Sequence, residues 1–146
     1  MIKHKTTVTI NKPVSEVYKF VFTDYFQNHP KWDPRVVSLK VDTTGPVGKG
    51  TKGHEVRKQG GRNTDYAFEI VDFQPSRSMT FQAKGGPAQF SAVWAVKAVN
   101  DKQSQLELDF NLKMGGVMML MEPFMAGSFR REIDGAGATI KSMLER

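Results

Sequence analysis

The residues of this sequence that could do acid–base or metal chemistry are three histidines, scattered carboxylates and a few tyrosines. His4, His29 and His54 lie far apart, and none has the spacing of a zinc-binding helix, so we expect no metal site and no cofactor. The chain has no cysteine, which excludes disulfides, thiolate ligands and a cysteine nucleophile. Any catalysis would therefore be acid–base work by side chains that point into a cavity.

Three residues are weak catalytic candidates: His54, Tyr66 and Asp72. Each shares one side of a predicted strand with an apolar residue two positions away, so each could face the interior. A buried Asp72 near His54 would make an acid and base pair. The alternative, which we favour, is that His54 and Asp72 stand at strand ends and face water.

Residues 48–53 match the dinucleotide-binding pattern G-x-G-x-x-G. That mechanism requires a helix after the glycines, whose N-terminus receives the pyrophosphate. Here a strand is predicted from residue 51, so the glycines indicate a turn.

The net charge is +6, and one cluster of cations stands out. An anionic partner is one interpretation. The other, which we favour, is a solvated hairpin at a sheet edge, because no aromatic and basic RNA-binding pattern accompanies the cluster. We therefore expect no nucleic-acid partner. The cluster contains Lys49, Lys52, Arg57, Lys58 and Arg62.

The elements that must position any site follow a simple order. Alternation predicts a strand over residues 2–10, and a spacing of three and four predicts a helix after Pro13. A short helix over 25–28 should end at His29 and Pro30. Period-two patterns then predict strands over 35–42, 51–59, 62–73 and 77–84, with a hairpin turn at Gly60 and Gly61. Two more strands are predicted by alternation over 90–96 and 106–112, with a hairpin at residues 100 and 101 between them.

From Val117 to the end, apolar residues at steps of three and four predict one long helix. We expect an α+β helix-grip fold, in which a curved antiparallel sheet of about seven strands wraps around this helix in a single domain, residues 1–146. Gly135 and Gly137 inside the helix indicate either a bend or the close approach of a strand. No signal peptide or membrane span is visible, and we expect a soluble cytoplasmic protein, monomer or homodimer.

Three segments carry a resemblance to a known superfamily. Residues 10–18 (INKPVSEVY), 29–34 (HPKWDP) and 47–51 (VGKGT) resemble the opening strand and helix, the tryptophan segment and the glycine turn of START-like proteins. This superfamily includes birch-pollen-allergen-like proteins and polyketide cyclases/dehydratases. The resemblance implies a cavity between sheet and long helix that holds a small hydrophobic molecule. It carries over no catalytic residue, because the superfamily has no universal one.

Large apolar side chains at inward positions are the candidate ligand contacts, although a solid core would give the same pattern. Methionines at the start of the long helix suggest a deformable pocket wall; an irregular core or a dimer contact would explain them equally. We expect binding or transport of a small hydrophobic molecule, because polar inward positions are sparse. The alternatives are a cyclase-like enzyme and a co-chaperone-like interaction module. The candidate contacts are Trp32, Tyr66, Phe68, Phe81, Trp94, Phe110, Met118, Met121, Phe124 and Met125.

Overall fold

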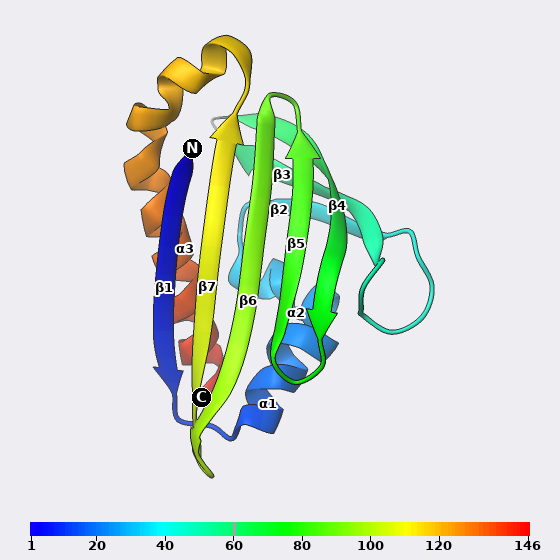
Figure 1. Ribbon diagram of the computed structural model, residues 1–146, viewed down its shortest axis with the longest axis vertical. Coiled ribbons are helices and arrows are strands. Elements are labelled where there is room, and N and C mark those ends of the chain that lie inside the picture. The colour runs from blue at the N-terminus through cyan, green and yellow to red at the C-terminus, as the bar shows by residue number, and fades with distance from the viewer. Residues whose placement is uncertain (60) are drawn as a thin grey trace.

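A single antiparallel sheet wraps around the long helix α3 (Glu122–Leu144) in the computed structural model, which describes residues 1–59 and 61–146 (Figure 1). The predicted helix-grip fold is confirmed. The seven strands lie in the order β1-β7-β6-β5-β4-β3-β2. Their bounds are β1 Ile2–Ile10, β2 Val36–Val41, β3 Lys52–Gln59, β4 Arg62–Gln74, β5 Ser78–Gly85, β6 Ala88–Asn100 and β7 Gln103–Met114.

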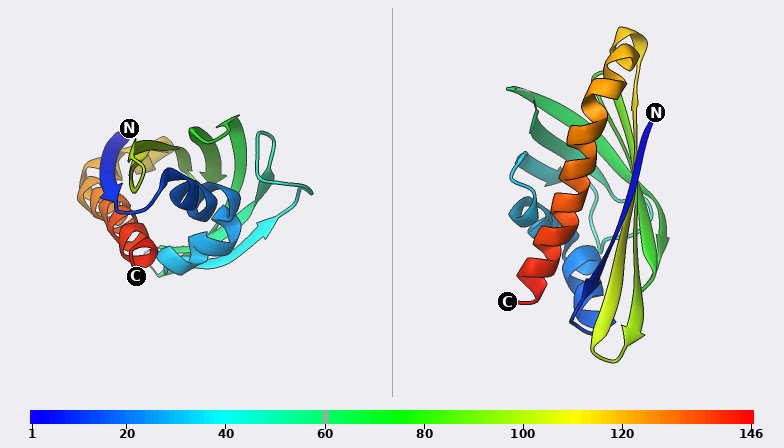
Figure 2. Two further views of the ribbon diagram at one scale, coloured as in Figure 1. Left: turned by 90° about the horizontal axis from the view of Figure 1, so that it is seen from below. Right: turned by 90° about the vertical axis from the view of Figure 1, so that its left-hand side faces the viewer.

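Two blocks cover the concave face of the sheet (Figure 2). Helix α3 runs along it, and α1 (Val14–Tyr18), the π-helical turn η1 (Lys19–Thr23) and α2 (Tyr25–Trp32) fill one end. The core lies between them, and β7 shows how the sequence produces it, since every second residue from Ser104 to Met114 is buried. None of the helices described is long and apolar enough to span a membrane.

The glycines of α3 have different roles. A Cβ on Gly137 would lie 3.3 Å from a methyl group of Val8 in β1, so this glycine allows the strand and the helix to approach closely. A Cβ on Gly135 would meet nothing within 4 Å. The close approach of a strand therefore explains why a glycine is needed at position 137, but it does not explain the glycine at position 135.

The predicted start of the long helix is wrong by about one and a half turns. Gly116–Met121 forms a separate 3-10 helix, η2, and α3 begins at Glu122 with Pro123 in its first turn. Proline has no N–H to donate and its ring blocks the preceding turn, so it is favoured at a helix start and not inside one. The apolar residues before it therefore lie off the buried stripe of α3.

The predicted end of α2 is also wrong, because the helix continues through Pro30 to Trp32. The residue before a proline is only biased against helix, and packing outweighs that bias here. Tyr25, Asn28, His29 and Trp32 are buried at the spacing of one helical face. The predicted turn at Gly60 and Gly61 includes a residue outside the described ranges, but its flanks pair as expected, Gln59 with Arg62.

Candidate functional site

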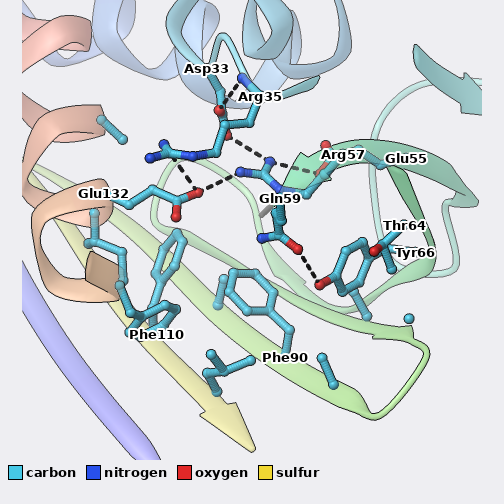
Figure 3. Close-up of a pocket in the computed structure, with 18 of the residues that line it drawn as sticks. Asp33, Arg35, Glu55, Arg57, Gln59, Thr64, Tyr66, Phe90, Phe110 and Glu132 are labelled. Carbon is cyan, nitrogen blue, oxygen red and sulfur yellow. Dashed lines mark hydrogen bonds and ion pairs between the residues drawn. The ribbon is translucent and has the colours of Figure 1, made fainter. Parts of the chain in front are cut away.

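A cavity of about 830 Å³ lies between the concave sheet and α3 (Figure 3). Several aromatic residues of its floor also pack on one another, with ring centroids 5.9 Å apart for Trp32 and Trp94 and 5.6 Å for Trp94 and Phe110. These rings therefore serve the core and the cavity wall at once. Eight of the ten predicted contacts line the cavity: Trp32, Tyr66, Phe68, Phe81, Trp94, Phe110, Phe124 and Met125.

The other two predicted contacts, Met118 and Met121, lie in η2 and are not among the residues that line the cavity. They are 37% and 45% exposed, respectively. Their predicted place assumed that α3 begins several residues earlier than it does. Of the three methionines predicted for a deformable wall, only Met125, beside Phe124, lines the cavity.

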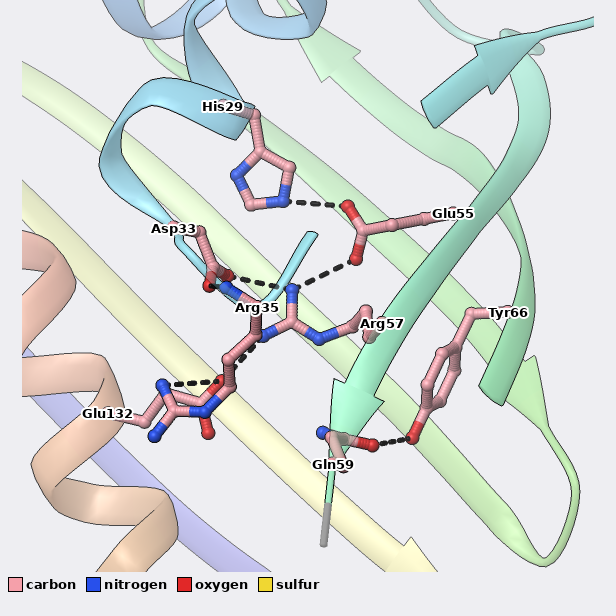
Figure 4. Close-up of polar contacts among 8 residues, drawn as sticks. All are labelled: His29, Asp33, Arg35, Glu55, Arg57, Gln59, Tyr66 and Glu132. Atoms are coloured by element: carbon pink, nitrogen blue, oxygen red, sulfur yellow. Dashed lines mark hydrogen bonds and ion pairs between the residues drawn. The ribbon is translucent and has the colours of Figure 1, made fainter. Parts of the chain in front are cut away.

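One side of the cavity is polar, and Arg57 of β3 is its centre (Figure 4). Its Nη1 donates to Asp33 Oδ2 at 2.7 Å and to Glu55 Oε2 at 3.0 Å, and its Nη2 donates to Glu132 Oε1 at 2.6 Å. Arg35 Nη1 also lies 3.7 Å from Glu132 Oε1. The guanidinium thus links β3 to the α2–β2 connection and to the middle of α3.

Strand register explains which side chains of β3 face this cavity. Glu55 pairs with Tyr66 across the β3–β4 ladder, so both point to the same side, and Arg57 and Gln59 follow at intervals of two. The Tyr66 hydroxyl donates to Gln59 Oε1 at 2.8 Å. The sequence interpretation missed this polar wall, and the sparse polar interior that it predicted is wrong.

Glu55 is held ionised inside this wall. Burial pushes its pKa upward, but the hydrogen bond from His29 and the charge of the Arg57 guanidinium outweigh burial, so the pKa lies below its ordinary value. Burial also works against the charge of Arg57, and there Asp33 and Glu55 more than compensate and raise its pKa.

His29 positions Glu55. Its Nε2 lies 2.7 Å from Glu55 Oε1, and its ring stacks on Tyr25 with centroids 4.9 Å apart. Its Nδ1 is buried and has no hydrogen-bond partner in the part of the chain that is described. A proton on Nε2, donated to the carboxylate, fits this arrangement, because it leaves Nδ1 as an unpaired acceptor and not as an unpaired N–H donor.

Two tyrosines on this side are kept protonated. Burial raises the pKa of Tyr25 well above its ordinary value, and the charge of Glu55 adds to that effect. Burial likewise raises the pKa of Tyr66, more than Arg57 lowers it. The wall therefore combines the ionised carboxylate of Glu55 with neutral phenols.

His54 and Asp72 face water, which is the interpretation that we favoured, and the inward direction considered for them is wrong. The side chain of His54 is 51% exposed, and its ring nitrogens lie 3.6 Å from Asp42 and 3.1 Å from Asp65 on the outer face of the sheet. Asp72 is exposed because a register shift between Ile70 and Asp72 reverses the alternation of β4. Of the three weak candidates, only Tyr66 reaches the cavity.

The cluster of cations divides in the structure. Arg57 turns into the cavity, while Lys49, Lys52, Lys58 and Arg62 are exposed. The hairpin is not at a sheet edge, because β1 and β2 are the outer strands. The expectation of an edge hairpin is therefore wrong.

The cavity opens between the first turns of α3, the end of β3 and the β5–β6 turn. Six residues there both line the cavity and are exposed, and we call them the mouth: Lys58, Gln59, Pro87, Phe124, Ser128 and Arg131. Within residues 1–59 and 61–146 no group of histidines and carboxylates is arranged to hold a metal ion.

Solved structures share this fold over nearly the whole chain. The Zhui aromatase/cyclase from a Streptomyces species is 15% identical, with 99% of this chain and 93% of that chain covered and a TM-score of 0.80. A START superfamily protein from Mycobacterium smegmatis is 10% identical, covering 98% and 97% with a TM-score of 0.79. Ara h 8.0201 is 16% identical, covering 97% and 96% with a TM-score of 0.75. At these identities the likeness shows the fold alone.

A comparison with curated protein sequences finds no match. The model of one family does match, over residues 1–141, and its description is polyketide cyclase / dehydrase and lipid transport. Because the match spans nearly the whole chain, the protein belongs to the polyketide cyclase/dehydrase and lipid transport family.

Proposed function

We propose that this protein binds an uncharged hydrophobic molecule that carries aromatic rings and hydroxyl groups. The volume of about 830 Å³ is within the ordinary range for small-molecule pockets. Phe90 and Phe110 meet edge to face, with ring centroids 5.4 Å apart, and line the wall opposite the polar side. Flat aromatic ligands stack well on such rings.

The charge of the polar side carries the proposal. Three carboxylates, of Asp33, Glu55 and Glu132, face the two guanidinium groups of Arg57 and Arg35, which leaves one negative charge in excess. The other cations that line the cavity, Lys58 and Arg131, lie on its exposed mouth. An anionic ligand such as a fatty acid would be repelled there, whereas a hydroxyl group can donate to a carboxylate.

The carboxylate of Glu132 has an oxygen that can accept a hydrogen bond from a ligand hydroxyl group. Its Oε1 is taken by Arg57, while its Oε2 has no hydrogen-bond partner among the residues described. Its side chain is 23% exposed, so the oxygen is shielded but reachable from the cavity. A ligand hydroxyl would complete the coordination of this carboxylate.

The first test is the native mass of freshly purified protein, compared with its denatured mass, to detect a retained molecule. The second compares two ligands of one shape, phenanthrenol and phenanthrene carboxylate, by calorimetry. We expect the phenol to bind at least about 10-fold more tightly, which corresponds to ~1.4 kcal/mol. Equal binding, or tighter binding of the carboxylate, would refute the charge argument.

Glu132→Gln is the matched variant, because it removes the excess charge and keeps the shape of the side chain. The affinity for phenanthrene carboxylate should then rise toward that for the phenol. Thr139→Ser is the control, since it lines the same cavity without a charge. Its preference for the phenol should equal that of the wild type.

A second candidate, a cyclase-like reaction in the same cavity, is favoured by the convergence of ionised Glu55, Arg57 and protonated Tyr66. An ionised carboxylate can accept a proton from carbon next to a carbonyl group, and a guanidinium can stabilise the enolate oxygen. The test is the conversion of a linear poly-β-ketone surrogate to an aromatic product, followed by absorbance. No product above the protein-free rate would count against this candidate and leave the binding proposal intact.

A further inference from the structure

An apolar tip projects beside the mouth of the cavity. It consists of the exposed residues of η2 and the first turn of α3: Val117, Met118, Met119, Leu120, Met121 and Phe124. Val117 is 81% exposed, Leu120 77% and Phe124 80%, and η2 buries none of its residues. An exposed run of large apolar residues is unusual in a soluble domain and marks a contact surface.

The tip lies at one end of the molecule. It is the yellow-orange segment at the top of Figure 1, beyond the ends of β6 and β7, and the right-hand view of Figure 2 shows it at the extreme of the long axis. Phe124 belongs both to the tip and to the mouth, so the two are continuous. A surface that receives the tip would face the opening of the cavity.

The exposed charged side chains that flank the tip in the sequence are cations. Lys113, Arg130 and Arg131 are exposed, and Glu122 is the only acidic residue between positions 113 and 131. Glu122 is buried; it accepts the N–H of Met114 at 2.8 Å and pairs with the N-terminal ammonium. The tip is therefore an apolar projection among cations.

We propose that this tip docks on the surface of an anionic lipid bilayer, with the mouth of the cavity toward the lipid. Apolar side chains beside cations are the composition that interfacial membrane segments share. A stable protein interface needs roughly 20–30 residues on each side, and six side chains on a convex end fall far short of that. A fluid bilayer accepts such a projection without a matching groove.

The experiment is co-sedimentation of the full chain with vesicles of equal parts phosphatidylcholine and phosphatidylglycerol, and with vesicles of phosphatidylcholine alone. We expect binding to the anionic vesicles that weakens at high salt, and little binding to the neutral ones. The variant Val117→Ser/Leu120→Ser should lower the bound fraction at least about 10-fold. Neither residue lines the cavity, so ligand binding is not altered by the change.

The matched control is Val37→Ser/Val99→Ser, which removes two valines of 55% and 52% exposure that lie outside the tip. It should bind vesicles as the wild type does, and circular dichroism should show both variants folded. Failure of the wild type to bind anionic vesicles, or equal binding by the tip variant, would overturn the proposal. So would a lipid-free dimer that the tip variant abolishes, which would assign the tip to a second copy of the chain.

Discussion

Replacing Arg57 with methionine should destabilise the fold, because it removes the cation that three carboxylates of the cavity wall share. The side chain of Arg57 is 12% exposed, and its three carboxylate partners are 13%, 15% and 23% exposed. Methionine keeps most of the length and apolar area of the stem but removes the cation. The variant therefore leaves buried carboxylates in a cluster that only Arg35 still offsets.

The magnitude follows from the cost of leaving buried charges unpaired. Removing one partner of a buried ion pair typically costs about 3–5 kcal/mol of unfolding free energy. In a chain of this size that corresponds to a melting temperature about 10 °C lower. With a urea dependence of about 2 kcal/mol per molar, the midpoint should fall by about 2 M.

The assay is urea unfolding of the wild type and the Arg57→Met variant at neutral and acidic pH. Arg57 is one of the groups that lower the pKa of Glu55, so the variant loses part of that lowering. The lost stability is therefore fully present above the usual pKa of Glu55, 4.5, and disappears as the pH falls through the lowered folded-state pKa. The gap in unfolding free energy between variant and wild type should narrow by at least about 1 kcal/mol from about pH 7 to about pH 4.

Arg35→Met is the control, because the side chain of Arg35 is 42% exposed and its contact with Glu132 is 3.7 Å long. The Arg35→Met change should lower the free energy of unfolding by less than about 1 kcal/mol, because exposed ion pairs contribute little to stability. If Arg57→Met costs no more than Arg35→Met, or if its cost does not change with pH, Arg57 does not hold the carboxylates together and the reasoning is wrong.

Three further predictions concern single residues. Glu55→Gln should lower the free energy of unfolding by about 2 kcal/mol at neutral pH. Because the folded-state pKa of Glu55 is lowered, its ionised carboxylate stabilises the fold fully above its usual pKa of 4.5, and this stabilisation is lost as the pH falls through the folded-state pKa. Urea unfolding of both proteins across that pH range measures the loss. Gly53→Ala should lower the free energy of unfolding by about 3 kcal/mol in chemical denaturation, because its Cβ would overlap the carbonyl oxygen of Lys40 and the ring of Phe68. Gly135→Ala should raise stability by about 0.5–1 kcal/mol in the same assay, because its Cβ meets nothing within 4 Å; a loss would show that the cavity needs that space.

The sequence predicted most of the fold because its periodic patterns are strong. In β7 apolar and polar residues alternate in the sequence as buried and exposed side chains alternate in the strand. The short spacing between successive strands predicts hairpins, and hairpins determine most of the strand order. Helix ends were less reliable. At Pro30 the packing of α2 in the core outweighed the preference of a residue before proline for an extended conformation, so the helix continued. At Pro123 the preference of proline for the first turn of a helix made α3 begin later than its apolar pattern predicted.

The site was predicted in its apolar half only. The aromatic positions follow from alternation, whereas Arg57 shares its strand with the exposed Lys52 and Lys58 and contacts Asp33 and Glu132, which are 24 and 75 positions away. The spacing of residues along the sequence does not predict contacts between such distant positions. One signal was present: a turn at Gly60 and Gly61 aligns Glu55 with Tyr66, and an inward Tyr66 then requires an inward Glu55 in place of His54.

Strand β1, at one edge of the sheet, can be paired only late in the assembly of the fold. Ile2 pairs with Leu112 and Ile10 with Ser104, so β1 is synthesised long before β7 exists to receive it. Helix α3 also packs on β1, through Gly137 and Val8. Pairings between such distant segments close slowly, because a large loop must be ordered before any contact is gained. During synthesis β1 is therefore an unpaired edge that other chains can capture, and its protection depends on completion of the last helix.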